Sequence, residues 1–338
     1  MKFRDLAAVA FLALLANGPA IVEPARSVEG GDPAAFSTIR RMGRGVNILG
    51  YDGVWEGGVN APFRAQDFAL IRKAGFTHVR INFFGFRYMS VENRIDPTVL
   101  VRLDRIIEQS IRDGLTPVLD QHDNQLCQST PEKCGPKLVA FWDQIAAHYA
   151  GAHPQLIFEI LNEPGGAMSH TVWNAALRDA LAVIRAHDAA RFVIVAALNN
   201  SAHDIENLDL PPADRRLIVT AHYYLPFTFT HQGAPWSPRL SALHDVDWGS
   251  EADKARVVED FSLARDWASK HDRPLYLGEF GVYEKAPISA REAWMRHVAK
   301  TAESYGWSWA YWQFDHDFSL FDSSSHSWRQ PLLDALMR

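Results

Sequence analysis

At residues 157–164 the chain reads Ile157-Phe158-Glu159-Ile160-Leu161-Asn162-Glu163-Pro164, and this stretch decides the fold. Its apolar run predicts a buried strand, and its polar end predicts that the strand opens into a loop. A second stretch, Leu275-Tyr276-Leu277-Gly278-Glu279-Phe280-Gly281, has the same form. A carboxylate is costly to bury inside a strand, but at a strand end it stays accessible while burial tunes its pKa. Two such carboxylates on separate strands predict a shared site.

Apolar runs rich in β-branched and aromatic residues alternate with helical patterns along the chain, which is typical of a parallel sheet built from βα units. We expect eight strands, at 45–49, 78–84, 116–121, 156–161, 191–197, 217–223, 274–280 and 308–314. We expect helices at 66–74, 97–113, 137–149, 171–187, 250–270 and 289–305, and only a short one within 199–215. This order predicts a single α/β domain, a (β/α)8 TIM barrel. A doubly wound open sheet is the rival, but it usually has a Gly-rich turn after its first strand, which residues 49–54 lack.

The composition fits one large domain, because 47% of the 338 residues are hydrophobic. The net charge is −6, and a mildly acidic chain lacks the clustered Lys and Arg that nucleic-acid binding needs. The 11 Trp residues have two readings, a well-filled core or a cleft whose Trp rings stack on sugars. We expect residues 1–20 to be a signal peptide, 21–37 a lead-in arm and 38–338 the catalytic (β/α)8 domain.

The N-terminus has the pattern of an export signal. Lys2 and Arg4 precede an apolar run at 6–15, and Gly18-Pro19-Ala20 offers small residues for cleavage. Ten apolar residues are too few to span a bilayer, which needs about 20. We therefore expect a bacterial secreted or periplasmic protein with no membrane attachment after cleavage; a buried helix or a retained anchor are the alternatives.

Cys127 and Cys134 are the only cysteines, in a segment that we expect to be a loop. In an exported protein they would form a local disulfide worth about 2–3 kcal/mol in the chain-entropy model. A lone pair at this spacing lacks the further ligands of a metal site.

Polar and aromatic side chains lie at six of the expected strand ends, on the rim where TIM barrels hold their catalytic groups. They are Arg80, His122, Asn162 with Glu163, His222 with Tyr224, Glu279 and Trp312. One such Arg would usually be a structural ion pair and one such His a core residue, and a buried ion-pair network is the alternative for the whole set. Together the set predicts an active site.

These motifs resemble the glycoside hydrolases of clan A, and more closely family 5, the cellulase family. The resemblance rests on Asn-Glu-Pro at 162–164 and Gly-Glu-Phe-Gly at 278–281. Further matching strings are 44–50, 222–227 and 230–236, and the likeness runs from about Ser37 to the C-terminus.

The resemblance implies that Glu163 is the acid/base and Glu279 the nucleophile of a retaining hydrolase, with carboxyl groups about 5–5.5 Å apart. Arg80 and Tyr224 suit the role of holding Glu279 ionised and oriented. The other implied roles are the sugar 2-hydroxyl contact for Asn162, the flanks of the catalytic subsite for His122 and His222, and its aromatic floor for Trp312.

Other side chains near these strands invite different readings. Glu159 should lie inside strand four and pair with Arg80 or another cation. Asp120 and Asp123 are expected to be supporting residues rather than metal ligands. Two or three of Trp55, Phe83, Phe84, Trp236, Trp248, His316 and Trp328 should form sugar platforms, with Trp236 the best candidate.

The leading hypothesis is a retaining endo-β-1,4-glucanase that acts on a β-glucan as a monomer, with no cofactor and no metal. A mannanase, xyloglucanase or β-1,3-glucanase would use the same catalytic frame, because substrate choice resides in loops. A metal-dependent barrel hydrolase is a second hypothesis. Such enzymes often have His-x-His at the end of the first strand, and this chain has Val46-Asn47-Ile48 there, which argues against it. A catalytically inactive sugar-binding barrel is a third.

Overall fold

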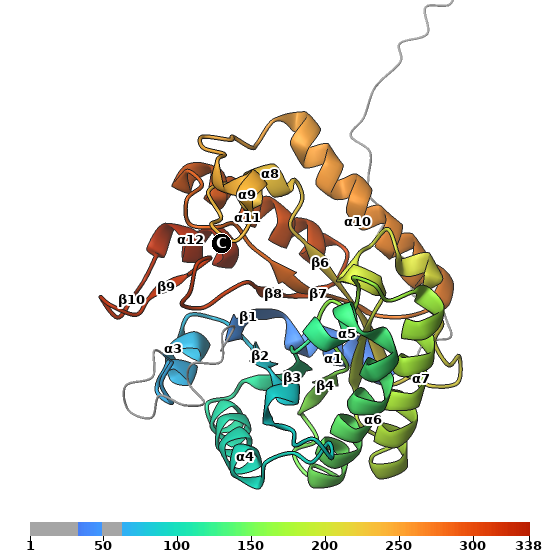
Figure 1. Ribbon diagram of the computed structural model, residues 1–338. Coiled ribbons are helices and arrows are strands. Elements are labelled where there is room, and N and C mark those ends of the chain that lie inside the picture. The colour runs from blue at the N-terminus through green and yellow to red at the C-terminus, as the bar shows by residue number, and fades with distance from the viewer. Residues whose placement is uncertain (1–32, 49–62) are drawn as a thin grey trace, which may run out of the picture.

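The computed structural model describes residues 33–48 and 63–338, and eight parallel strands close into a barrel in the order in which they occur in the chain. The strands are β1 (Arg44–Ile48), β2 (His78–Phe83), β3 (Thr116–Gln121), β4 (Ile157–Glu159), β5 (Val193–Ala196), β6 (Leu217–Tyr223), β7 (Leu275–Phe280) and β8 (Ser308–Tyr311). Helices surround them (Figure 1). The predicted (β/α)8 barrel is confirmed.

Two strands end two or three residues earlier than expected because their last residues leave the ladder. β4 ends at Glu159 rather than at residue 161, and β8 ends at Tyr311 rather than at residue 314. The expected end of the first strand, Leu49, lies outside the described residues. Since barrel strands are covered on both faces, their apolar runs show where a strand lies more clearly than where it stops.

Three of the outer helices begin at a capping side chain. The outer helices are α3 (Asp67–Lys73), α4 (Pro97–Arg112), α6 (Pro131–His148), α7 (His170–His187), α10 (Glu251–His271), α11 (Ile288–Ser304) and α12 (Gln330–Met337). Asp96 caps α4, Ser169 caps α7, and Ser250 forms a reciprocal capping box with Asp253 at α10. The fifth crossover contains only two 3-10 turns, η3 (Leu198–Asn200) and η4 (Ile205–Asn207).

The segment around the two cysteines is helical, so the expectation of a loop there is wrong. A single turn, α5 (Gln125–Ser129), leads into α6, which begins at Pro131. We expected this helix to start at residue 137, directly after Pro136, but Pro136 lies inside α6. Pro131 occupies the first helical position, where a missing N–H costs nothing. The expected disulfide between Cys127 and Cys134 is present and ties α5 to α6.

Helix α1 (Pro33–Met42) closes one end of the barrel. Its Ile39 and Met42 pack against inward-facing side chains from the strands, namely Val118, Ile157, Ile194, Ile218, Tyr276 and Ala310. The boundary that we expected after Ser37 therefore falls within a helix that belongs to the barrel. The expected signal peptide at 1–20 lies outside the described residues.

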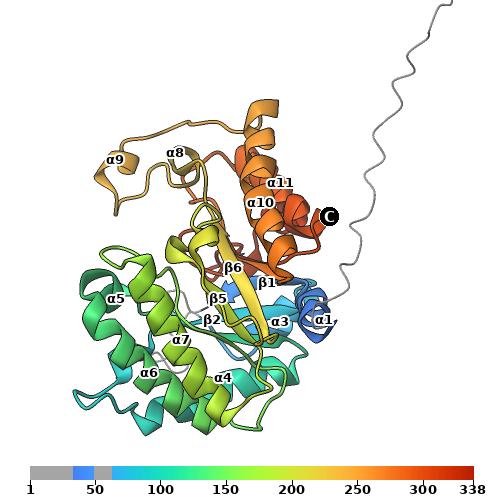
Figure 2. The ribbon, with the colours of Figure 1, turned by 90° about the vertical axis from the view of Figure 1, so that its right-hand side faces the viewer.

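The carboxyl ends of the strands, where the sequence predicts the site, form the opposite end of the barrel. In Figure 2, α1 lies at one end of the molecule, while α5 and the short helices α8 (Phe227–Thr230) and α9 (Pro238–Ser241) lie at the other. None of the helices in the described ranges is both long and apolar enough to cross a bilayer.

Candidate active site

Arg80 lies at the centre of the site, fully buried in β2 and surrounded by acceptors. Its guanidinium donates to Glu159 at 2.8 Å and to Glu279 at 2.6 Å, and it lies 3.1 Å from Asp120. It also donates to the side-chain oxygen of Asn162 at 2.9 Å. A planar guanidinium can hold several oxygens in a fixed geometry, and these carboxylates keep its pKa well above the usual value. Arg80 thus joins the ends of four strands, and Glu159 pairs with it as expected.

Glu279 is the penultimate residue of β7 and is almost fully enclosed, with 5% of its side chain exposed. Arg80 donates to one carboxylate oxygen, and the Tyr224 hydroxyl donates to the other at 2.8 Å. Burial raises the pKa of Tyr224, so its hydroxyl keeps the proton that it donates. These donors stabilise a negative charge on Glu279 and fix the direction in which the carboxylate points.

Glu163 has a different environment. It lies on the loop after β4, with a left-handed backbone (φ 42°), and 38% of its side chain is exposed. Burial of the remainder raises the pKa of Glu163. No guanidinium from the described residues binds its carboxylate, so desolvation favours the protonated form of Glu163.

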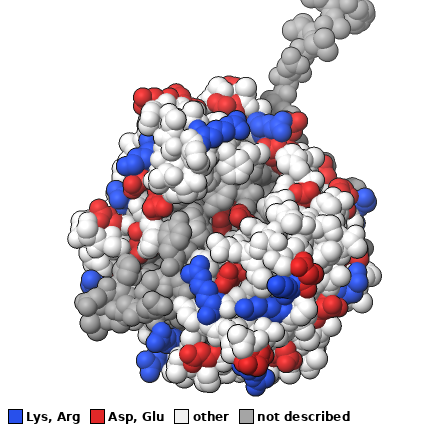
Figure 3. Space-filling model, viewed as in Figure 1, with Lys and Arg blue, Asp and Glu red and all other residues white. Residues whose placement is uncertain are grey.

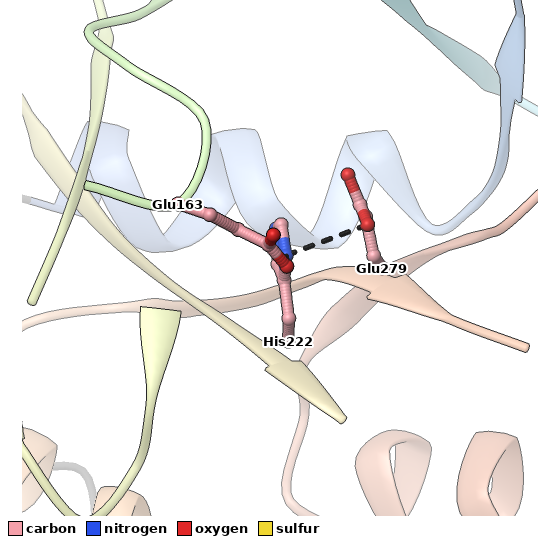
Figure 4. A group of neighbouring side chains, drawn as sticks. All are labelled: Glu163, His222 and Glu279. Atoms are coloured by element: carbon pink, nitrogen blue, oxygen red, sulfur yellow. Dashed lines mark hydrogen bonds and ion pairs between the residues drawn. The ribbon is translucent and has the colours of Figure 1, made fainter. Parts of the chain in front are cut away.

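The two carboxylates face each other across a short gap (Figure 4). One oxygen of Glu163, one oxygen of Glu279 and a ring nitrogen of His222 all lie within 4.8 Å of one another. This is a shorter separation than the roughly 6.5–9.5 Å that leaves room for a water between two carboxyl groups.

His222 lies next to both Glu163 and Glu279. Its Nδ1 lies 3.0 Å from Glu163 and 3.5 Å from Glu279, so it carries the ring proton and donates it toward the carboxylates. The other nitrogen, Nε2, then accepts from the side-chain amide of Asn200 at 2.9 Å. Burial lowers the pKa of His222 to about 4, which keeps the ring neutral near pH 7. The register of β6 against β7 shifts between Ala221 and His222, so that His222 pairs with Glu279.

His122 and Trp312 form one wall of the site. Their rings stack with centroids 5.5 Å apart and planes 7° apart. The Nδ1 of His122 lies 2.6 Å from Asp120, which accepts a hydrogen bond from it. Asp120 is in turn paired with Arg80. Burial lowers the pKa of His122 to about 4 and raises that of Asp120 to about 6. Asp120 therefore orients His122, as expected of a supporting residue.

Two polar contributors were not singled out from the sequence. Asn200 sets the proton position on His222, and Asn47 on β1 donates to the carbonyl of Gly278 and accepts from Arg80. Each directly follows or interrupts an apolar strand run, which is the signal that identified the other strand-end residues. Asn200 escaped notice because its crossover has only 3-10 turns.

Aromatic side chains extend from Glu163 and Glu279 toward the rim. Tyr224, Trp312, Phe318 and Tyr283 form one cluster, and Trp236 packs on Tyr283 with ring centroids 5.0 Å apart. Trp236 is 51% exposed. Figure 3 shows a hollow near the centre of this face with acidic side chains in it and Lys and Arg at its edge.

The other platform candidates have different surroundings. Phe83 and Trp248 are buried in the outer core, and Trp328 packs on Phe76 and Phe321. Phe84 lies under the Arg87 guanidinium, 3.9 Å from its ring centroid. His316 is paired with Asp315, and Trp55 falls outside the described residues.

Glu163, His222 and Glu279 form the one group of three side chains in the described ranges whose atoms lie close enough to hold a metal ion. Arg80 and Tyr224 already occupy both oxygens of Glu279, and the Nδ1 of His222 carries a proton. This donor set suits proton transfer better than metal binding, which requires unprotonated imidazole and free carboxylate oxygens.

Comparison with known proteins places the geometry in context. The family model described as cellulase (glycosyl hydrolase family 5) matches residues 39–317. Endoglucanase H of Acetivibrio thermocellus is 26% identical over 327 residues, which cover 93% of this chain and 34% of that protein. Cellodextrinase A of Ruminococcus flavefaciens is 27% identical over 258 residues, 72% of this chain and 76% of that protein. This chain spans about a third of the length of the first two curated relatives that it matches.

Solved structures are similar over nearly the whole chain. Thermotoga maritima Cel5A in complex with mannotriose has a TM-score of 0.86 at 34% identity, covering 90% of this chain and all of that one. The same protein in complex with cellobiose has a TM-score of 0.85 at 34% identity, with the same coverage.

Proposed function

The chain belongs to glycosyl hydrolase family 5, and from that premise we propose that it is a retaining endo-β-1,4-glucanase. The observation that carries the proposal is the approach of the Glu163 and Glu279 carboxylates to within 4.8 Å. A retaining hydrolase needs its nucleophile close enough to attack the anomeric carbon while the acid reaches the leaving oxygen.

In the first step Glu279 attacks the anomeric carbon and Glu163 protonates the departing glycosidic oxygen. The surroundings of the two residues support this division. Glu279 is enclosed by donors that stabilise its charge, whereas burial raises the pKa of Glu163 and lets it hold a proton. In the second step Glu163 deprotonates a water, which displaces Glu279 and restores the configuration.

The remaining residues position the sugar. Arg80 holds the Asn162 oxygen, which leaves the amide nitrogen to donate to the sugar 2-hydroxyl. Trp312 offers an aromatic floor, and the neutral His122 and His222 flank the subsite. Hydrogen bonds to the 2-hydroxyl strengthen as positive charge develops on the ring.

The relatives and the residues at the rim support the proposed substrate class. Several relatives are named endoglucanases, and one similar structure contains cellobiose. Trp236, half exposed beside Tyr283, offers a platform for a distal sugar of a polymer. A β-mannan is the second candidate, since another similar structure contains mannotriose. We further propose that the protein is exported by its N-terminal signal and acts as a monomer without a cofactor.

The test is product analysis on carboxymethylcellulose, barley β-glucan, mannan, xyloglucan and laminarin. We expect a rapid fall in the viscosity of the first two polymers. NMR of cello-oligosaccharide hydrolysis should show the β-anomer before mutarotation. An α-anomer formed first would contradict retention, and preferential cleavage of mannan or laminarin would contradict the assignment to β-1,4-glucan.

A further inference from the structure

The backbone of Glu163 needs support that its own strand does not supply. β4 ends four residues earlier, and Glu163 has a φ of 42°, a region that non-glycine residues occupy at a cost of about 1 kcal/mol or more. Such a conformation persists only when neighbouring groups hold it. The direction of the carboxylate depends on this backbone, because the side chain starts from it.

The support comes from α5, in the segment that joins β3 to α6. The side-chain amide of Gln128 donates to the backbone carbonyl of Glu163 at 3.1 Å, and the amide of Asn124 approaches the same oxygen at 3.5 Å. Gln128 is partly buried, on the side of α5 that faces the loop. Gln125, on the same turn, is exposed.

The rest of the loop is held by backbone groups. The Ala167 N–H donates to the carbonyl of Gln128 at 2.8 Å, and the Asn199 N–H donates to the carbonyl of Pro164. A Cβ on Gly166 would lie 2.6 Å from the Gln128 carbonyl oxygen, so loop and helix are in direct contact. These contacts survive a change of the Gln128 side chain, whereas the hydrogen bond to the Glu163 carbonyl does not.

A five-residue helix has little stability of its own, so α5 must be fixed by its neighbours. Cys127, adjacent to Gln128, forms the disulfide with Cys134 of α6, and both cysteines are fully buried. Helix α6 packs along α7 on the outside of the barrel (Figure 1). The covalent bond therefore connects the turn that carries Gln128 to a long, well-packed helix.

We propose that Gln128 is a positioning residue that orients Glu163 through its backbone carbonyl, and that the Cys127–Cys134 disulfide holds Gln128 in place. The proposal rests on the acid/base role proposed for Glu163. It assigns the disulfide an effect on the proton-transfer step in addition to its effect on stability.

The test is the dependence of the rate on the leaving group. Gln128→Met keeps the shape of the side chain and removes the donor, and Gln125→Met on the same turn is the matched control. We would measure kcat/KM for aryl β-cellobiosides of increasing phenol pKa. Loss of one hydrogen bond should lower the value for the poorest leaving groups about fivefold in Gln128→Met and leave dinitrophenyl cellobioside almost unchanged. Gln125→Met should match the wild type throughout.

A purely structural role would lower the rate for all substrates by the same factor, because it would change only the fraction of folded enzyme. A uniform loss, or no loss, in Gln128→Met overturns the proposal. Glu163→Gln, measured in the same series, distinguishes the acid role of Glu163 from the positioning role of Gln128. If Glu163→Gln itself shows no dependence on the leaving group, the acid role fails; if it does and Gln128→Met does not, only the positioning role fails.

The disulfide is tested in the full-length protein by Cys127→Ala/Cys134→Ala, and by wild type reduced with dithiothreitol in case that variant does not fold. At a temperature where circular dichroism shows native structure, the same selective loss for poor leaving groups is expected. A loss that is equal for all leaving groups, or full activity, would overturn the part of the proposal that concerns the disulfide.

Discussion

The roles proposed for Glu163 and Glu279, two residues of the same type, rest on the difference between their neighbours. Glu279 receives hydrogen bonds from Arg80 and Tyr224 and is 5% exposed. Glu163 is 38% exposed, and among the described residues only the neutral His222 lies at hydrogen-bonding distance from its carboxylate. A carboxylate that accepts charged donors favours ionisation, whereas one whose burial is not compensated in this way favours protonation. These surroundings suit Glu163 to the proposed acid role and Glu279 to the proposed nucleophile role.

This difference predicts a pH dependence. Since burial raises the pKa of Glu163, kcat/KM should fall as the pH rises through that pKa and the acid loses its proton. In Glu163→Gln, measured with dinitrophenyl cellobioside, the alkaline fall should disappear because no proton is lost from residue 163. An unchanged alkaline limb in that variant would mean that another group sets it.

Glu163 and Glu279 could be predicted from the sequence as candidate site residues, because each lies at the end of an apolar run. Their partners could not all be found that way. Gln128 and Asn200 act across the fold on Glu163 and His222, which are 35 and 22 residues away in the chain. Asn200 follows an apolar run but lies on a crossover with only 3-10 turns, and nothing in the local sequence of Gln128 indicates its contact with Glu163, which only the folded barrel creates.

At the scale of elements, the loops of the barrel mouth extend the candidate site beyond Glu163 and Glu279. The segment that follows β6 contains α8 and Trp236, whose ring packs on Tyr283 from the loop after β7. Two crossovers thus meet above the strands and form one aromatic surface.

We expect Trp236→Ala to raise KM for barley β-glucan roughly fivefold to tenfold, which corresponds to about 1 kcal/mol of lost stacking. Values for short aryl cellobiosides should stay the same, since these do not reach the rim. Trp236→Phe should recover most of the affinity. An equal effect on long and short substrates would show that Trp236 only supports the fold.

The closed end of the barrel predicts a different pH effect. Buried His78 lies between the Met42 carbonyl, 2.8 Å away, and the Tyr276 hydroxyl, 3.0 Å away, and burial lowers its pKa to about 4. In the unfolded chain its pKa is about 6.5, so the unfolded state binds more protons between these values. Stability from the neutral ring is complete above about pH 6.5 and is lost as the pH falls, by up to about 1.4 kcal/mol per unit.

His78→Gln should remove that slope. Urea unfolding between pH 7 and pH 4 should show that the wild type loses stability more steeply than the variant. Parallel curves would contradict the buried neutral histidine. Activity near pH 7 should be retained, because His78 lies at the end of the barrel closed by α1.

Element boundaries were the least predictable part of the fold. Apolar runs located all eight strands, but β4 and β8 stop early, where the backbone turns to place Glu163 and Trp312. Helix α6 begins at Pro131 because a proline suits a first turn, a preference that the second proline at 136 obscured.

Over the whole molecule, one end of the barrel is apolar and packed, and the other end contains the charged residues of the candidate site. Helix α1 seals one end with apolar side chains, and the other end holds a buried arginine surrounded by the carboxylates Asp120, Glu159 and Glu279. Removing one partner of this network would leave an uncompensated buried charge. The proposed function therefore explains the charged groups at the mouth better than packing alone does. The alternation of strands and helices made this architecture predictable, since eight βα units in one chain have few other arrangements.

The central claim is that two glutamates perform a double displacement, and Glu279→Ala with added azide tests it most directly. The variant should fold as the wild type does, shown by circular dichroism, and hydrolyse dinitrophenyl cellobioside orders of magnitude more slowly. Azide should enter the space left by the carboxylate, restore turnover and yield the α-cellobiosyl azide. A variant that azide does not rescue, or a product of β configuration, would contradict Glu279 as the nucleophile.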